Sequence, residues 1–149
     1  MTLHYTTSVY IKYNEKILLH KHSKLGTIIP VGGQIRAHEV PAEAARREIK
    51  EETGLDIMII GSHELLKFAD SVELAQPVHI MLEEASIGHQ CVCFVFFAVA
   101  DTRMLTPRDG ESNELMWLTE DEIITHESIS EYVRCMALKL LHSETQHAG

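Results

Sequence analysis

Residues 32–55 read GGQIRAHEVPAEAARREIKEETGL. Strong helix formers fill positions 42–53, Pro41 suits a first helical turn, and Gly54 suits a left-handed stop at the C-terminal end. The pattern therefore predicts a helix over residues 42–53 that follows a glycine-containing loop.

The predicted helix has three faces with different chemistry. At about 100° per residue, Ala45 and Ile49 share an apolar face, and a second face of mixed charge is expected to meet water. The third face places three carboxylates within one turn of one another, those of Glu48, Glu51 and Glu52. We expect the apolar face to pack on a sheet and the carboxylate face to carry chemistry.

Three carboxylates so close together repel one another and call for a neutralising partner. Arg47 lies four residues before Glu51 and can neutralise only part of this charge. Mg²⁺ or Mn²⁺ prefers carboxylate oxygen and is usually completed by substrate phosphates, so the face predicts a metal site for a di- or triphosphate. A solvated acidic helix face is the alternative. Gly32 and Gly33 favour the metal site, because glycine lets main-chain groups approach a ligand or ion closely.

Segments of strand-forming residues surround this helix in the sequence. The expected strands cover residues 5–13, 17–22, 28–35, 55–60, 79–82, 91–100 and 114–118. Thr119 is expected to cap a short turn beginning at Glu120, and a C-terminal helix is expected over about 128–142, whereas residues 62–77 show no clear pattern. Strands before, between and after two helices predict an α/β fold with a mixed sheet and helices on its faces.

Length and composition indicate one compact domain over residues 1–149, since the chain is 45% hydrophobic and contains no linker or repeat. The longest apolar stretch, Cys91 to Ala100, is about half of what a membrane-spanning helix needs. The first seven residues have no basic flank followed by an apolar block, which argues against a secretory signal. We therefore expect a cytoplasmic protein without a membrane span.

The charge balance excludes another class of partner. Lys and Arg total 13 against 22 Asp and Glu, a formal charge of −9, so nucleic acid polymers are poor ligands for this chain. Small phosphorylated molecules remain possible if carboxylates hold divalent cations, which invert the local charge. The three cysteines form no CxxC pair and are expected to be reduced: Cys91, Cys93 and Cys135.

The stretch from Gly33 to Leu55 also matches a known motif. Its defining residues are Gly33, Glu39, Arg47, Glu48, Ile49, Glu51, Glu52, Gly54 and Leu55, at the spacing of the whole Nudix box. The chain therefore resembles a Nudix hydrolase. The resemblance implies the Nudix fold, an α/β/α sandwich with a mixed β-sheet, over nearly the whole chain. It also implies hydrolysis of a nucleoside diphosphate linked to another group X, with Mg²⁺ or Mn²⁺ as cofactor.

The resemblance assigns roles to individual residues of the box. It implies metal ligation by the Gly32 carbonyl and by the carboxylates of Glu48, Glu51 and Glu52. Arg47 would orient these glutamates, Glu39 would support the loop and helix, and Gly54 would end the helix. Glu48 or Glu52 is expected to serve as the general base, and Gly33 is expected to approach the substrate.

Two residues outside the box are further candidates. Family members can use an extra acidic residue just before a late strand, and Glu114 stands at the start of the predicted strand over 114–118. Lys21, at the end of an early strand, is the better phosphate partner among its neighbours because its charge does not depend on pH near neutrality. The histidines on either side of it, His20 and His22, are expected to be surface or strand-end residues.

The substrate is read from residues outside the box, and several markers of family subclasses are missing. Neither the proline of ADP-ribose hydrolases nor the tyrosine of diadenosine-polyphosphate hydrolases stands near Ser71, and the array typical of NADH hydrolases is absent. The chain therefore resembles members that hydrolyse free nucleoside or deoxynucleoside triphosphates. A hydrolase of nucleoside diphosphate sugars and a non-catalytic nucleotide-binding module are the alternatives. A homodimer remains open.

Overall fold

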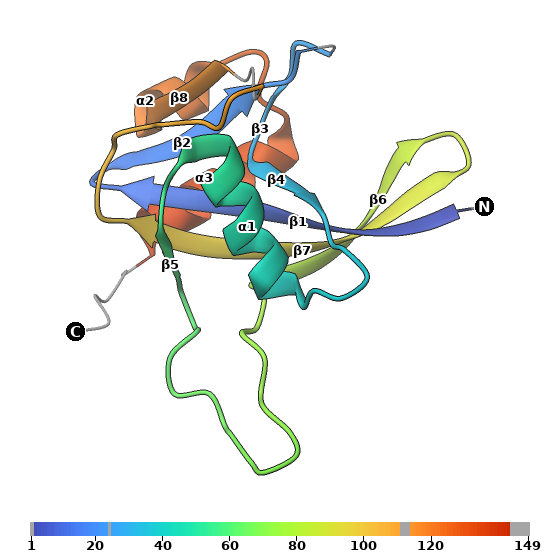
Figure 1. Ribbon diagram of the computed structural model, residues 1–149. Helices are drawn as coiled ribbons and strands as arrows, with labels where there is room; N and C mark the ends of the chain where they lie inside the picture. The colour runs from blue at the N-terminus through green and yellow to red at the C-terminus, as the bar shows by residue number, and fades with distance from the viewer. Residues whose placement is uncertain (1, 24, 111–113, 144–149) are drawn as a thin grey trace.

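One mixed β-sheet forms the centre of the computed structural model, which describes residues 2–23, 25–110 and 114–143 (Figure 1). Its strands are β1 (Thr2–Tyr13), β2 (Lys16–Lys21), β3 (Ile28–Ile29), β4 (Val31–Gln34), β5 (Ile57–Ile59), β6 (His79–Ser86), β7 (His89–Ala100) and β8 (Glu114–Thr119). The helices are α1 (Pro41–Thr53), α2 (Glu120–Thr125) and α3 (Glu131–His142). A mixed sheet with helices confirms the predicted α/β class.

The long strands β1 and β7 run side by side in parallel through the middle of the sheet, with Tyr10 opposite Phe97. The order across the sheet is β3, β2, β1, β7 and β5, and every pairing other than that of β1 with β7 is antiparallel over the described residues. In addition, β4 pairs with β1, β6 with β7, and β8 with β2. This pairing places the glycines of β4 directly beside β1 and under α1.

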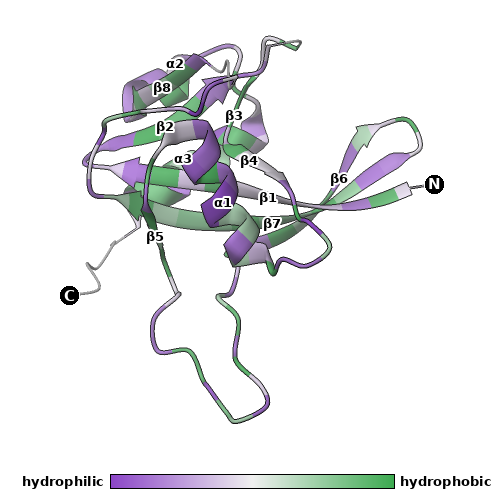
Figure 2. Cartoon of the chain, in the orientation of Figure 1, coloured by the Kyte–Doolittle hydropathy of each residue, from purple (hydrophilic) through white to green (hydrophobic). Residues whose placement is uncertain are grey.

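Helices cover the two faces of the sheet, α1 on one side and α3 on the other (Figure 1). Successive side chains of β1 alternate between these faces, as expected for a strand. Val9 and Ile11 pack in the core under α1, whereas Tyr10 packs in the core under α3. Figure 2 shows hydrophilic residues on the outward side of α1 and hydrophobic ones on the strands behind it. The apolar face predicted for the helix therefore lies on the sheet, with Ile49 fully buried.

Helix α1 begins and ends where the sequence predicts. Pro41 is its first residue, and Gly54 ends it in the left-handed region with φ of 78°. The Gly54 N–H donates to the carbonyl of Lys50 at 3.0 Å. A Cβ on Gly54 would also overlap Thr106, so this position requires glycine for both conformation and space.

Other elements differ from the prediction in their boundaries. The predicted strand over 28–35 is divided into β3 and β4 at Pro30, which has no N–H to donate to a ladder. The hairpin of β6 and β7 is longer than predicted and turns at Gly88, whose φ is 79°. Residues 62–77 form a loop with an isolated bridge between Lys67 and Val72.

The C-terminal helix starts later than predicted, at Glu131. Ser130 caps it by accepting from the N–H of Val133, and the preceding Ser128 carbonyl instead accepts from Ile28 at 3.1 Å. The expected cap at Thr119 is confirmed, because its side chain accepts from the N–H of Glu122 at the start of α2. Within the described part of the chain, no helix has both the length and the apolar character needed to cross a bilayer.

Candidate active site

The two glycines before α1 allow two close approaches. A Cβ on Gly32 would overlap the main-chain oxygen of Thr7 in the neighbouring strand β1. A Cβ on Gly33 would overlap the carboxylate of Glu48, which lies directly over this residue. Gly32 therefore lets β4 sit close to β1, and Gly33 leaves the space in which the first carboxylate of the helix is held.

Arg47 is anchored by the loop that precedes the helix. Its Nε and Nη2 donate to the two carboxylate oxygens of Glu39 at 2.6 and 2.9 Å, and Nη2 also donates to the Gln34 carbonyl at 3.0 Å. The N–H of Arg36 donates to Glu39 as well, at 3.0 Å. The hydrogen bond from Arg47 lowers the pKa of the Glu39 carboxyl from 4.5 to about 2, and it raises the pKa of Arg47. This pairing joins the loop to the helix.

The carboxylate face of α1 is neutralised in part by two arginines. Nη1 of Arg47 donates to Glu48 at 3.0 Å and lies 3.4 Å from Oε2 of Glu51. The other oxygen of Glu51 accepts from Nη1 of Arg108 at 3.2 Å. The Oε2 atom of Glu52, on the same face, is shielded from solvent. The structure therefore brings the predicted glutamates and Arg47 together on one side of the helix.

The donor chemistry of this face fits a hard divalent cation. The oxygens are those that Mg²⁺ and Mn²⁺ prefer, and a positive group, Nη1 of Arg47, already bridges Glu48 and Glu51. In residues 2–23, 25–110 and 114–143, however, no three His, Cys, Asp or Glu side chains converge in a ready-made metal cage. A cation bound here would therefore compete with guanidinium contacts for the same oxygens.

Lys21 and Glu114 lie opposite each other where β2 and β8 pair. Both are exposed, and the alternation of these strands assigns them to the face of the sheet away from α1, since Leu19 and Met116 lie in the core under α3. The structure thus brings the two residues together, on the face of the sheet opposite to α1 and its carboxylates. Their predicted roles in the site stay predictions.

His20, next to Lys21, points to the opposite side of β2 and is buried. Burial lowers the pKa of its imidazole, and Nδ1 accepts or donates no hydrogen bond among the described residues. This histidine is therefore a buried neutral side chain near the end of β2, so the strand-end alternative holds for it and the surface alternative does not.

Arg108 is a site residue that sequence reasoning misses. It belongs to the segment after β7, and its main-chain N–H donates to the Glu51 carbonyl at 2.9 Å, while Thr106 donates to the Thr53 carbonyl at 2.8 Å. These bonds tie the segment to the end of α1. No motif spacing links a basic residue at 108 to a glutamate at 51, so only the folded chain reveals the contact.

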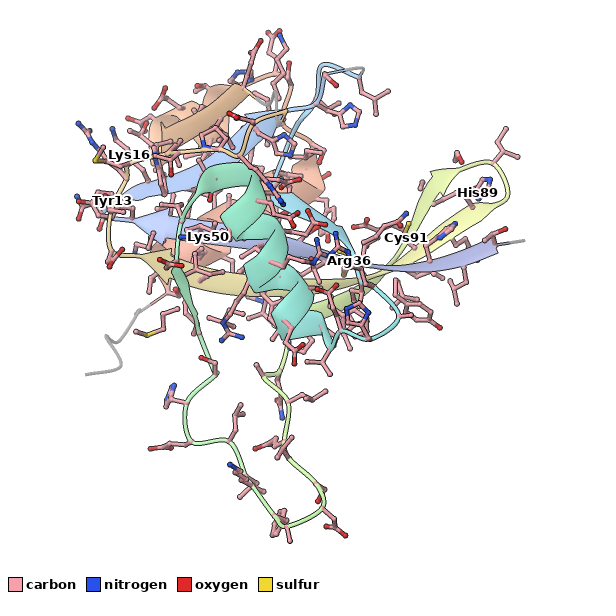
Figure 3. The ribbon with its side chains drawn as sticks, in the orientation of Figure 1. Tyr13, Lys16, Arg36, Lys50, His89 and Cys91 are labelled. Atoms are coloured by element: carbon pink, nitrogen blue, oxygen red, sulfur yellow. The ribbon has the colours of Figure 1, made fainter. Side chains whose placement is uncertain are left out.

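Two cavities flank the segment that carries Arg108. A small one of about 260 Å³ lies at the carboxylate face and is lined by Lys50, Glu51, Gly54, Thr106 and Arg108. A larger one of about 550 Å³ is lined by residues that include Tyr13, Lys16 and Trp117, and none of its lining residues belongs to the Gly33–Leu55 stretch. Figure 3 shows Tyr13 and Lys16 at the end of the sheet opposite to His89 and Cys91, and Lys50 on α1. The larger cavity therefore lies apart from the predicted chemistry.

Comparisons with known proteins find chains of similar sequence and fold. A family model described as NUDIX domain matches residues 2–136. The chain is 32% identical to a hydrolase of the NUDIX family from Clostridium perfringens, with a TM-score of 0.81 over 95% of this chain and 97% of that chain. It is 22% identical to a MutT NUDIX hydrolase from Burkholderia pseudomallei, with a TM-score of 0.65 over 94% of this chain and 98% of that chain.

A UDP-X diphosphatase also has a similar structure. The identity is 18% and the TM-score is 0.60, over 95% of this chain and 62% of that chain. The likenesses to this diphosphatase and to the MutT hydrolase concern the fold alone.

Proposed function

The chain belongs to the Nudix hydrolase family, whose members act on nucleoside diphosphate-linked substrates, and we propose that it hydrolyses nucleoside or deoxynucleoside triphosphates with Mg²⁺ or Mn²⁺. The observation that carries the proposal is the carboxylate face of α1, where Glu48, Glu51 and Glu52 lie on one side of the helix beside the anchored Arg47. The absence of the sequence markers of other subclasses favours triphosphates over conjugates.

Each residue of this face has a part in the proposed reaction. The Gly32 carbonyl and the carboxylates of Glu48, Glu51 and Glu52 would hold the metal. When bound, Mg²⁺ or Mn²⁺ polarises a phosphoryl oxygen and lowers the pKa of the attacking water. Glu48 or Glu52 accepts the proton of that water as it attacks phosphorus. The water oxygen forms a new bond to phosphorus while the phosphoric anhydride bond breaks, and the leaving phosphate oxygen takes the electron pair of the broken bond.

Arg47 acts on the carboxylates rather than on the substrate. Its guanidinium is fixed by Glu39 and by the Gln34 carbonyl, so its remaining donor holds Glu48 and Glu51 in a defined orientation. Preorganised ligands of this kind do not have to be reoriented during the reaction, which lowers its barrier. Gly33 contributes space, since any larger residue would push the Glu48 carboxylate aside.

A substrate panel tests the proposal. Nucleoside and deoxynucleoside triphosphates, nucleoside diphosphate sugars and dinucleoside polyphosphates are assayed with Mg²⁺ and with Mn²⁺, and phosphate, pyrophosphate and nucleotide are measured separately. We expect the highest kcat/KM for a triphosphate. A higher kcat/KM for a diphosphate sugar would favour the conjugate hydrolase, and binding without turnover would favour the nucleotide-binding module.

Glu43→Gln is the matched control for the metal dependence measured in this panel. Glu43 is an exposed glutamate on the mixed-charge face of the same helix. Its replacement removes one negative charge from α1 but leaves the carboxylate face intact, so the metal titration of this variant should follow that of the parent.

A further inference from the structure

Glu51 is shared by two arginines that reach it from different parts of the chain. Nη1 of Arg47 lies 3.4 Å from its Oε2 and Nη1 of Arg108 lies 3.2 Å from its Oε1, so each carboxylate oxygen faces a guanidinium. Each carboxylate oxygen has a second lone pair for a metal, but a divalent cation bound to Glu51 repels the guanidinium groups beside it and weakens at least one of these contacts. The question is which arginine is released.

The surroundings of the two arginines differ. Arg47 has a side chain that is 17% exposed, and it is held by Glu39 and the Gln34 carbonyl in addition to Glu51. Arg108 has a side chain that is 68% exposed, and among the described residues its guanidinium has one ion pair, the one with Glu51. An exposed ion pair is weak because water and salt compete for both partners. Arg108 is therefore the arginine that gives way.

The main chain of Arg108 is fixed even though its guanidinium is not. The bond from its N–H to the Glu51 carbonyl and the neighbouring bond from Thr106 to Thr53 hold the segment against the end of α1. A guanidinium released from Glu51 thus stays within one side-chain length of the carboxylate face. The cavity of about 260 Å³ that Arg108 lines with Lys50 and Glu51 provides the space in which it can turn.

We propose that Arg108 is a phosphate-binding residue that a divalent cation releases from Glu51. Without metal, Arg108 neutralises Glu51; with metal, its guanidinium pairs with a phosphate oxygen of the substrate. The planar fork of arginine suits two phosphate oxygens, and the phosphate takes over the negative charge that Glu51 had supplied. The proposal rests on the proposed function, since it assumes a phosphorylated substrate at the carboxylate face.

The proposal predicts opposite effects on metal and on phosphate. Metal and Arg108 compete for Glu51, so removing Arg108 should tighten the binding of the metal alone, by about two- to fivefold on the scale of an exposed ion pair. The same change should weaken the binding of a phosphate ligand to the metal-loaded protein, by about tenfold or more on the scale of a charge-assisted hydrogen bond. A residue with a merely structural role would weaken both or neither.

The test measures binding rather than turnover. Mn²⁺ affinity is determined by titration followed with electron paramagnetic resonance, first alone and then with methylenediphosphonate, a diphosphate that is not hydrolysed. The variants are Arg108→Ala and Arg108→Lys, and the matched control is Arg103→Ala, which removes an exposed arginine from the same segment beside the larger cavity. Thermal unfolding of each variant checks that the segment stays folded.

We expect Arg108→Ala to bind Mn²⁺ more tightly and methylenediphosphonate more weakly, Arg108→Lys to recover part of the phosphate affinity, and Arg103→Ala to match the parent. Weaker Mn²⁺ binding by Arg108→Ala, or unchanged diphosphonate affinity at saturating Mn²⁺, would overturn the proposal. The probe carries no nucleoside, so a parent protein that binds it but hydrolyses no nucleoside triphosphate contradicts the proposed function while Arg108 is still tested.

Discussion

Glu39 and Glu51 are both ion paired to Arg47, yet the two ends of this network differ in their surroundings. Glu39 takes two hydrogen bonds from Arg47 and one from the Arg36 N–H, and its side chain is 8% exposed. Glu51 takes a longer contact from Arg47 and an exposed one from Arg108, and its side chain is 22% exposed. The motif thus has an anchored half around Glu39 and an open half around Glu51.

The difference shows how one residue type serves two purposes within one motif. In the anchored half, the carboxylate is saturated by donors and holds the loop against the helix. In the open half, the contacts of Glu51 are longer or more exposed, and we expect a cation to compete for this carboxylate. We therefore expect changes in the anchored half to lower stability, and changes in the open half to lower activity while the fold remains intact.

The largest effect is expected for the open half. Replacing Glu51 or Glu52 by Gln keeps the volume and removes an anionic ligand, so turnover should fall by about a hundredfold or more. The free energy of unfolding in metal-free buffer should change by only a few tenths of a kcal/mol, because each substitution removes repulsion between like charges. For Glu51→Gln, the lost contacts with Arg47 and Arg108 offset that gain. Steady-state rates across a Mg²⁺ titration and chemical denaturation in chelator measure the two effects.

Glu43→Gln serves again as the control for these substitutions, since it removes a glutamate from another face of α1. If Glu51→Gln and Glu52→Gln both retained the parental rate at every Mg²⁺ concentration, the carboxylate face would be only a solvated acidic surface. The open half would then have no part in activity, and the two halves would differ only in their surroundings.

Gly33 lies directly against the carboxylate of Glu48, and Gly33→Ala should have the next largest effect. The added Cβ overlaps the carboxylate of Glu48, which must then move, and displacement of a reacting group by about 1 Å can cost roughly a hundredfold in rate. Gly32→Ala is the contrasting variant, because its Cβ meets the main-chain oxygen of Thr7 instead. Kinetics and thermal unfolding of both should show a loss dominated by activity for Gly33→Ala and by stability for Gly32→Ala.

Glu39→Gln tests the anchored half through its pH dependence. Because the pKa of Glu39 is lowered to about 2 from 4.5, its pairing with Arg47 contributes stability that is fully present above pH 4.5 and is lost as the pH falls toward 2. The parent should therefore be more stable than Glu39→Gln at neutral pH, and the difference should shrink below pH 4.5. Denaturation midpoints of both proteins between pH 3 and 7 measure it, and a difference independent of pH would contradict the ion pair as its source.

The sequence alone predicts the helix and the shared face of its carboxylates from local geometry, whereas the role of Glu39 in the anchored half is implied only by the resemblance to Nudix hydrolases. Helical periodicity places Glu48, Glu51 and Glu52 on one face, and Pro41 and Gly54 mark the ends of the helix through backbone constraints that act within a few residues. The role of the glycines was predicted only in part. The sequence predicts that Gly32 and Gly33 allow close approach to a ligand or ion, and the structure adds their close approach to Thr7 and Glu48.

The rest of the site depends on contacts between distant segments. Arg108 meets Glu51 because the chain returns past the end of α1 after crossing the sheet, and no local pattern encodes that return. The same limit applies to the strands that carry Lys21 and Glu114. The sequence predicts that both segments are strands. The face on which each side chain lies follows from the register in which β2 and β8 pair, and a shift of that register by one residue would exchange the faces.

The smallest effect is expected for Glu114, which the sequence suggests as an extra acidic residue of the site. In the structure it lies opposite Lys21 on the face away from α1, so Glu114→Gln should change turnover by less than about twofold, as is usual for an exposed side chain. Opposite charges across two strands contribute about 0.2–1 kcal/mol, so Glu114→Gln and Lys21→Gln should each lower stability slightly and the double variant by less than their sum. A double-mutant cycle of unfolding free energies, with kcat measured on the same four proteins, checks this. A tenfold or greater loss of kcat in Glu114→Gln with normal kcat in Lys21→Gln would show that Glu114 reaches the carboxylate face after all, and the open half of the site would then extend beyond α1.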